Sequence, residues 1–184
     1  MRFVFACFGL CACDIDTEFN HCPVPVVINE VMSASTNDWI ELYNPGNDAV
    51  DLTGFRLSRT RDEVEFTIPA EQPDGTGGTT DTVLDRHEFL LLMADSFREG
   101  PLAAEHLVTG FDLNRDGDGV WLRASADDAF SKCDQAIYPD QHADFSWARQ
   151  PDGGDDWCDA SFTTPGARNA PCECESEGGT SPWC

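Results

Sequence analysis

The segment Asp112-Leu113-Asn114-Arg115-Asp116-Gly117-Asp118 carries oxygen-bearing side chains at alternate positions. This alternation, with a glycine at the turn, is typical of the first half of an EF-hand calcium loop. The twelfth position of such a loop is Arg123 here, where a bidentate glutamate belongs. We therefore favour a hairpin turn that needs no metal and expect no cofactor. The alternative is weak Ca²⁺ binding by Asp112, Asn114, Asp116 and Asp118.

Other motifs that carry chemistry are few. His142 stands between Asp140 and Asp144, which could present three ligands, but no His-x-His or His-Glu-x-x-His accompanies it. The sequence contains no Gly-x-Ser-x-Gly elbow and no Gly-Lys-Ser phosphate loop. Trp121 and Trp147 fall in expected strands and are interpreted as core residues. The pattern predicts a protein that is not an enzyme.

Cysteine is heavily used, with nine residues in 184. No Cys-x-x-Cys occurs, so paired-knuckle zinc and thioredoxin-like sites have no support. Six cysteines lie beyond the first apolar stretch and are expected to form disulfides in an oxidising compartment: Cys22, Cys133, Cys158, Cys172, Cys174 and Cys184. Six thiols allow 15 pairings. Proximity along the chain favours Cys133–Cys158, Cys174–Cys184 and Cys22–Cys172.

The charge is strongly negative, at −23 from 34 acidic and 11 basic residues. A field of this sign repels phosphate backbones, so we expect no nucleic-acid partner. It favours solubility, cation binding and basic partners.

The N-terminus has the features of an export signal. Met1-Arg2 is followed by the apolar run from Phe3 to Ala12, which is too short to span a membrane. Leu10-Cys11-Ala12-Cys13 resembles a bacterial lipobox, which implies removal of residues 1–12 and lipidation of Cys13. An ordinary cleaved signal peptide, giving a secreted protein, and a buried apolar strand are the alternatives. Cleavage before Cys13 with lipidation leaves an even six cysteines.

The residue pattern in the rest of the chain predicts short strands separated by turn residues. Residues 13–25 form a polar tether. Alternating or apolar runs predict strands at 26–32, 39–43, 55–58, 64–68, 89–93, 120–124, 136–138 and 145–149. Pro73 to Thr82 is expected to be a polar loop, and a turn of helix is expected near Pro101 to His106. This pattern predicts an all-β sandwich.

Four ordered motifs resemble the lamin-tail domain family. They are Val27-Ile28-Asn29-Glu30-Val31-Met32, Trp39-Ile40-Glu41-Leu42-Tyr43-Asn44-Pro45-Gly46, Ser146-Trp147-Ala148-Arg149-Gln150-Pro151-Asp152-Gly153 and Thr164-Pro165-Gly166-Ala167-Arg168-Asn169. Val50-Asp51-Leu52-Thr53-Gly54-Phe55 and Gly119-Val120-Trp121-Leu122 fit the same pattern. The resemblance implies an immunoglobulin-like β-sandwich over residues 26–170 with a disulfide-rich tail at 171–184. It supplies no catalytic residues.

These features together predict a non-catalytic, surface-anchored module for binding, adhesion or scaffolding. We expect a membrane-anchored lipoprotein of the bacterial cell envelope, held by a lipid anchor, with a protein or polysaccharide partner there. The alternative function is a calcium- or carbohydrate-binding accessory protein of an exported hydrolase. Glu30 and Glu41 are expected to face solvent or to cap neighbouring backbone, because no acid–base partner accompanies them.

Overall fold

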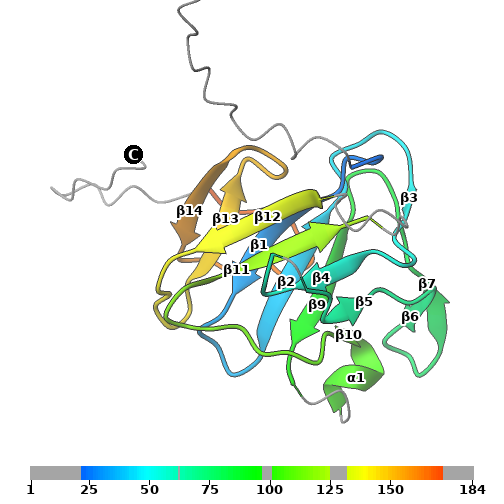
Figure 1. Cartoon of the computed structure of the whole chain (residues 1–184), viewed down its shortest axis with the longest axis horizontal. Coiled ribbons are helices and arrows are strands. Elements are labelled where there is room, and N and C mark those ends of the chain that lie inside the picture. Colours follow the sequence, from blue (N-terminus) through cyan, green and yellow to red (C-terminus); the bar gives the residue numbers. More distant parts are fainter. Residues whose placement is uncertain (1–21, 62, 97–100, 125–131, 172–184) are drawn as a thin grey trace, which may run out of the picture.

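The structure, a computed structural model, describes residues 22–61, 63–96, 101–124 and 132–171, which form a β-sandwich (Figure 1). The six-stranded sheet has the order β10 (Leu107–Val108), β9 (Phe89–Ala94), β2 (Asp38–Tyr43), β1 (Val27–Met32), β13 (Ser146–Gln150) and β14 (Asp156–Ala160). The four-stranded sheet has the order β12 (Lys132–Tyr138), β11 (Asp118–Arg123), β4 (Arg56–Ser58) and β5 (Phe66–Thr67). The predicted all-β immunoglobulin-like class is confirmed.

Small ribbons and one helix complete the described chain. β3 (Val50–Asp51) pairs with β8 (Val83–Leu84), and β6 (Glu71–Pro73) pairs with β7 (Thr79–Asp81). The helix α1 (Pro101–Glu105) lies where a helical turn is predicted. No helix in the described part of the chain is both long and apolar enough to cross a bilayer.

The core lies between the two sheets and follows from the alternation of the strands. Ile40 and Leu42 of β2 point inward, as do Val120 and Leu122 of β11, and all four are fully buried. Burial of each such side chain contributes about 1.5–3 kcal/mol. Trp147 joins this core, as predicted, with 8% of its surface exposed.

The prediction that Trp121 is a core residue is wrong. Its neighbours Val120 and Leu122 face inward, so the strand period places Trp121 on the outer face of the four-stranded sheet. There it is half-buried, and its indole N–H donates a 3.1 Å hydrogen bond to Gln135 of β12.

Two predicted loops also differ from the structure. The stretch Pro73 to Thr82 is exposed over residues 74–81, but Thr82 is buried, and residues 71–81 form the β6–β7 ribbon rather than an irregular loop. The turn at Asp112 to Asp118 is not a β-hairpin. It connects β10 of the six-stranded sheet to β11 of the four-stranded sheet, so the chain changes layer at this point.

Candidate functional site

A bulge in β1 sets the geometry of the outer face of the six-stranded sheet. Ile28 pairs with Leu42 of β2, but Glu30 pairs with Glu41, so Asn29 is the extra residue. A bulge rephases the side chains beyond it. Asn29 and Glu30 can therefore both avoid the core, while Ile28 and the later Val31 remain in it. Neither Asn29 nor Glu30 is exposed to solvent, because a later segment covers this face.

The covering segment, residues 164–169, is called the closing segment below. Glu30 holds its first residue, Thr164. The Thr164 hydroxyl donates to Glu30 Oε2 at 3.0 Å and the Thr164 backbone N–H donates to Oε1 at 3.3 Å. The Ser146 hydroxyl of β13 also donates to Glu30 Oε1. Burial raises the pKa of Glu30, although these hydrogen bonds act in the opposite direction.

Glu41 holds the middle of the closing segment. Its Oε2 accepts a 2.7 Å hydrogen bond from the backbone N–H of Gly166, and its Oε1 accepts one of 3.0 Å from the amide of Asn29. The pKa of Glu41 is raised to about 8, mainly by burial and also by the nearby Glu30 and Asp152. The hydrogen bonds lower the pKa, but their effect is smaller than that of burial. Glu30 and Glu41 thus cap backbone, one of the two roles predicted for them, and do not face solvent.

Asn169 fixes the end of the closing segment. Its amide donates to the backbone carbonyls of Arg149 at 3.0 Å and Asn29 at 3.3 Å, and its Oδ1 lies 3.0 Å from the Thr164 hydroxyl oxygen. Its backbone N–H donates to Asp152 at 2.9 Å. The bond to Asn29 spans 140 positions, so Asn169 joins the two ends of the domain in one buried polar network, in which the amides and carboxylates satisfy each other.

One disulfide joins the two layers, and it corrects the predicted pairing. Cys22 is bonded to Cys133 of β12, not to Cys172, and Cys133 is therefore not bonded to Cys158. Proximity along the chain failed as a guide because β12 lies beside β1 in space. Cys158 is also disulfide-bonded. The proposed Cys174–Cys184 pair lies outside the described residues.

Polar contacts continue this junction between the layers. Asp134 of β12 accepts a 2.6 Å hydrogen bond from the backbone N–H of Ile28 and forms an ion pair with Arg149 at 2.8 Å. Arg149 also donates to the carbonyl of Ile28 at 2.7 Å and stacks 4.5 Å from the ring centre of Trp157. Burial raises the pKa of Asp134, against the effect of Arg149. Each charge in this junction is therefore paired.

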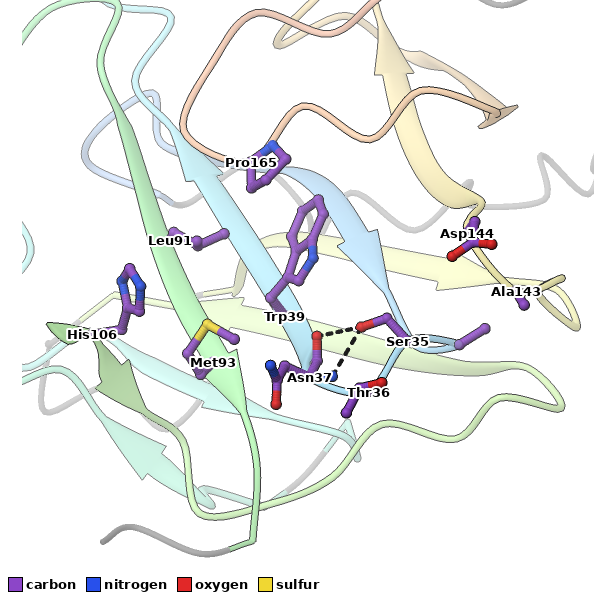
Figure 2. Close-up of a pocket in the computed structure, with 11 residues that line it drawn as sticks. Ser35, Thr36, Asn37, Trp39, Leu91, Met93, His106, Ala143, Asp144 and Pro165 are labelled. Carbon is purple, nitrogen blue, oxygen red and sulfur yellow. Dashed lines mark hydrogen bonds between the residues drawn. The ribbon is translucent and has the colours of Figure 1, made fainter. Parts of the chain in front are cut away.

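A pocket of about 690 Å³ opens beside Trp39 at the start of β2 (Figure 2). The β1–β2 turn forms one wall, and its Ser35 hydroxyl is hydrogen-bonded to the backbone of Asn37. Figure 2 shows the Trp39 ring between Leu91 and Met93 on one side and Ser35 on the other, with Pro165 above it. Pro165 is held there because its neighbours Thr164 and Gly166 are bonded to Glu30 and Glu41.

The buried Gln141, which was not predicted from the sequence, joins the remaining walls of the pocket. Gln141 is 1% exposed, and its Oε1 accepts from both the backbone N–H and the hydroxyl of Ser33. Its amide donates to the carbonyl of Val31. Gln141 therefore ties the turn after β1 to the loop that carries Ala143 and Asp144, which form the far rim.

The lamin tail domain model matches residues 22–136, which is more than half of the chain. The chain belongs to the lamin tail domain family. The family is a non-catalytic, immunoglobulin-like one, so the chain contains an immunoglobulin-like module. No curated protein matches the chain. The matched region ends at Ala136. Beyond it, β13 and the closing segment bond to Asn29, Glu30 and Glu41 inside the matched region, and β14 pairs with β13.

The glycine of the Asn44-Pro45-Gly46 turn in this lamin tail domain is required by close packing and not by a positive φ. A Cβ at Gly46 would lie 2.6 Å from Cγ of Pro25, so close packing excludes a side chain. Asn44 beside it is fully buried, and its amide donates to the carbonyls of Asp48, Leu84 and Asp85. Gly54 does have a positive φ of 81°, as a residue that relieves a bend should.

The four candidate calcium ligands lie in the connection between β10 and β11. Asp112 Oδ1 accepts a 2.8 Å hydrogen bond from the backbone of Ser96, Asn114 Oδ1 accepts from Asp116, and Asp118 Oδ1 accepts from Gly119. Within the described ranges, no three His, Cys, Asp or Glu residues come together as a metal site, and this holds for His142 with Asp140 and Asp144. The arrangement is that of a hydrogen-bonded turn; a turn without metal stays the prediction, and weak calcium binding stays the alternative.

Three predicted features of this lamin tail domain protein lie outside the described residues. They are the signal segment 1–12, the lipidation site Cys13 and the tail from Cys172 to Cys184.

Proposed function

We propose that this lamin tail domain is a non-catalytic binding module displayed at the bacterial cell envelope, where it acts in adhesion or scaffolding. The supporting observation is that the buried carboxylates of Glu30, Glu41 and Asp134 accept hydrogen bonds from the chain itself. Groups committed in this way position backbone. They are not held toward a cavity in which a substrate could react.

The pocket beside Trp39 contains Ser35, His106 and Asp144, which are the residue types of a hydrolase triad. The Ser35 hydroxyl, however, donates to the carbonyl of Asn37. Figure 2 shows His106 and Asp144 on opposite sides of the pocket. A triad requires the nucleophile, base and orienting acid to be hydrogen-bonded in series. The geometry therefore favours binding in this pocket over hydrolysis.

Display at the envelope agrees with the direction of β1, because the tether and the pocket turn lie at opposite ends of this strand. The tether, residues 13–25, precedes the first residue of β1, and the pocket turn follows the last residue. Six residues at about 3.3 Å each separate these ends by roughly 20 Å. Figure 1 shows the two ends of β1 at opposite ends of the sandwich, so an anchor at Cys13 would attach to the domain at the end opposite the turn after β1.

Photo-crosslinking in intact cells tests this function. A photoreactive residue replaces Thr36 on the exposed pocket turn, and a matched variant carries it at Thr80 on the exposed β6–β7 ribbon. We expect one defined envelope component to be captured from position 36 and much less from position 80. Equal capture at the two positions, or none at either, would contradict a specific binding role for this end of the domain.

A further inference from the structure

The pocket beside Trp39 has an apolar side that extends onto a second hydrophobic cluster. Trp39 pairs across the sheet with Met32 of β1 and Met93 of β9, and these three are buried together with Val108. Leu91 packs against the same cluster and is partly exposed at the pocket. A ligand with aliphatic carbon atoms would bury them against this wall.

The pocket also offers a hydrogen-bond donor. Trp39 has 7% of its surface exposed, and its indole N–H donates to no described residue. This N–H is not among the buried unpartnered atoms of the described chain, so a molecule in the pocket can reach it. A bound carbonyl oxygen could accept a hydrogen bond from it.

The rim of the pocket carries a negative charge, because the exposed carboxylate of Asp144 lies on it. The chain as a whole carries −23, so both the local and the overall fields attract a cation.

The terminal segments of this chain do not provide such a cation. Residues 13–21 and 172–184 contain no lysine or arginine. A carbohydrate fits the wall less well, because sugars stack on open aromatic faces and only 7% of the Trp39 side chain is exposed. A narrow aliphatic side chain that ends in a positive charge matches both the apolar wall and the acidic rim of the pocket.

We propose that the pocket binds an extended basic peptide segment of a partner protein. An arginine or lysine stem lies against Leu91 and Trp39, its charged end meets Asp144, and a backbone carbonyl of the peptide accepts from the Trp39 indole N–H. This inference rests on the proposed binding function and adds the chemistry of the partner.

Nuclear magnetic resonance on the ¹⁵N-labelled full-length chain tests this proposal through the indole N–H signal of Trp39. The probe is the blocked pentapeptide acetyl-Gly-Leu-Arg-Leu-Gly-amide, and its glutamate counterpart is the control. We expect the arginine peptide to shift the Trp39 signal saturably and the glutamate peptide to leave it unchanged. Asp144 has φ 71°, a conformation that asparagine accepts, so Asp144→Asn should fold normally.

The Asp144→Asn variant should weaken binding of the arginine peptide about fivefold, as loss of a partly exposed ion pair does. The matched Asp81→Asn variant makes the same charge change on the exposed β6–β7 ribbon and should alter affinity less than twofold. Equal weakening by both variants would mean that the effect is general charge attraction, and this would overturn the proposal. So would the absence of any shift, or a shift caused by an N-acetylglucosamine trisaccharide and not by the peptide. Capture of an envelope component at position 36 would still support the binding function in those cases.

Discussion

Glu30 of β1 lies directly opposite Glu41 of β2, and neither side chain has any surface exposed to solvent. Two carboxylates in a cross-strand pair normally repel each other. Here each accepts hydrogen bonds from the closing segment, which lies more than 120 residues further along the chain. Burial raises the pKa of both, so that Glu41, with a pKa of about 8, is protonated at neutral pH. This pair is the point at which the first and last motifs of the domain meet.

Removal of the Glu41 carboxyl should release the closing segment. In Glu41→Ala the Gly166 N–H and the Asn29 amide lose their acceptor, and we expect a loss of about 2–3 kcal/mol in the free energy of unfolding. Urea unfolding measures it. Glu63→Ala is the matched control, because Glu63 is exposed. Equal stability of the two variants would show that the network does not hold the domain together.

Stability should fall as the pH rises from about 5 to about 8. Glu41 and Asp38 have folded-state pKa values raised to about 8 and about 6, above the ordinary values of 4.5 and 3.8. In this window the folded state keeps protons that the unfolded state has lost, so raising the pH favours unfolding, by at most about 1.4 kcal/mol per pH unit for each proton. Thermal melts across the window measure the slope. Glu41→Gln should flatten it, and an unchanged slope in that variant would contradict the assignment.

The Cys22–Cys133 disulfide should be the main covalent support of the sandwich. It closes a loop of 111 residues between the two layers, and chain-entropy reasoning gives such a bridge about 4–5 kcal/mol. A Cys22→Ala, Cys133→Ala double variant should therefore unfold at a much lower urea concentration. Non-reducing peptide mapping should recover the Cys22 and Cys133 peptides joined. A peptide that joins Cys133 to Cys158 instead would contradict the structure.

Calcium should leave the melting temperature unchanged beyond general charge screening. Oxygen atoms of Asp112, Asn114 and Asp118 already accept backbone hydrogen bonds, which a bound ion would have to replace. Thermal melts in millimolar Ca²⁺, with Mg²⁺ as the charge-matched control, measure the effect. A saturable rise with Ca²⁺ alone, lost in an Asp116→Ala, Asp118→Ala double variant, would establish the calcium alternative.

Strong alternation predicted the long strands well, because β2 and β11 each have one face in the core. The strands β3, β8 and β10 have two residues each, too few to show a period. β14 was missed because Trp157 and Asp159 lie on its less buried side, which leaves only Cys158 and Ala160 as an apolar signal. The phase shift in β1 depends on the bulge at Asn29, which appears in the sequence only as the spacing of Ile28 and Val31.

The candidate site was much harder to predict than the strands. The motifs that contain Glu30, Glu41 and Thr164 were identified from sequence, but their contact depends on the order of strands in the sheet. The pocket beside Trp39 is formed by segments from five parts of the chain, so no local pattern marks it. The predicted disulfide pairing was wrong for the same reason, because β12 and β1 come into contact only when the two layers pack.

Every partner proposed for this domain lies at the cell envelope, so the proposed binding depends on display of the domain there. Mass spectrometry of the mature chain, together with its fractionation, tests whether the domain is anchored there. We predict an N-terminal residue Cys13 that carries a diacylglyceryl group, and a Cys13→Ser variant that leaves the membrane fraction. An unmodified Cys13 within a longer chain, or a Cys13→Ser variant that stays with the membrane, would contradict it.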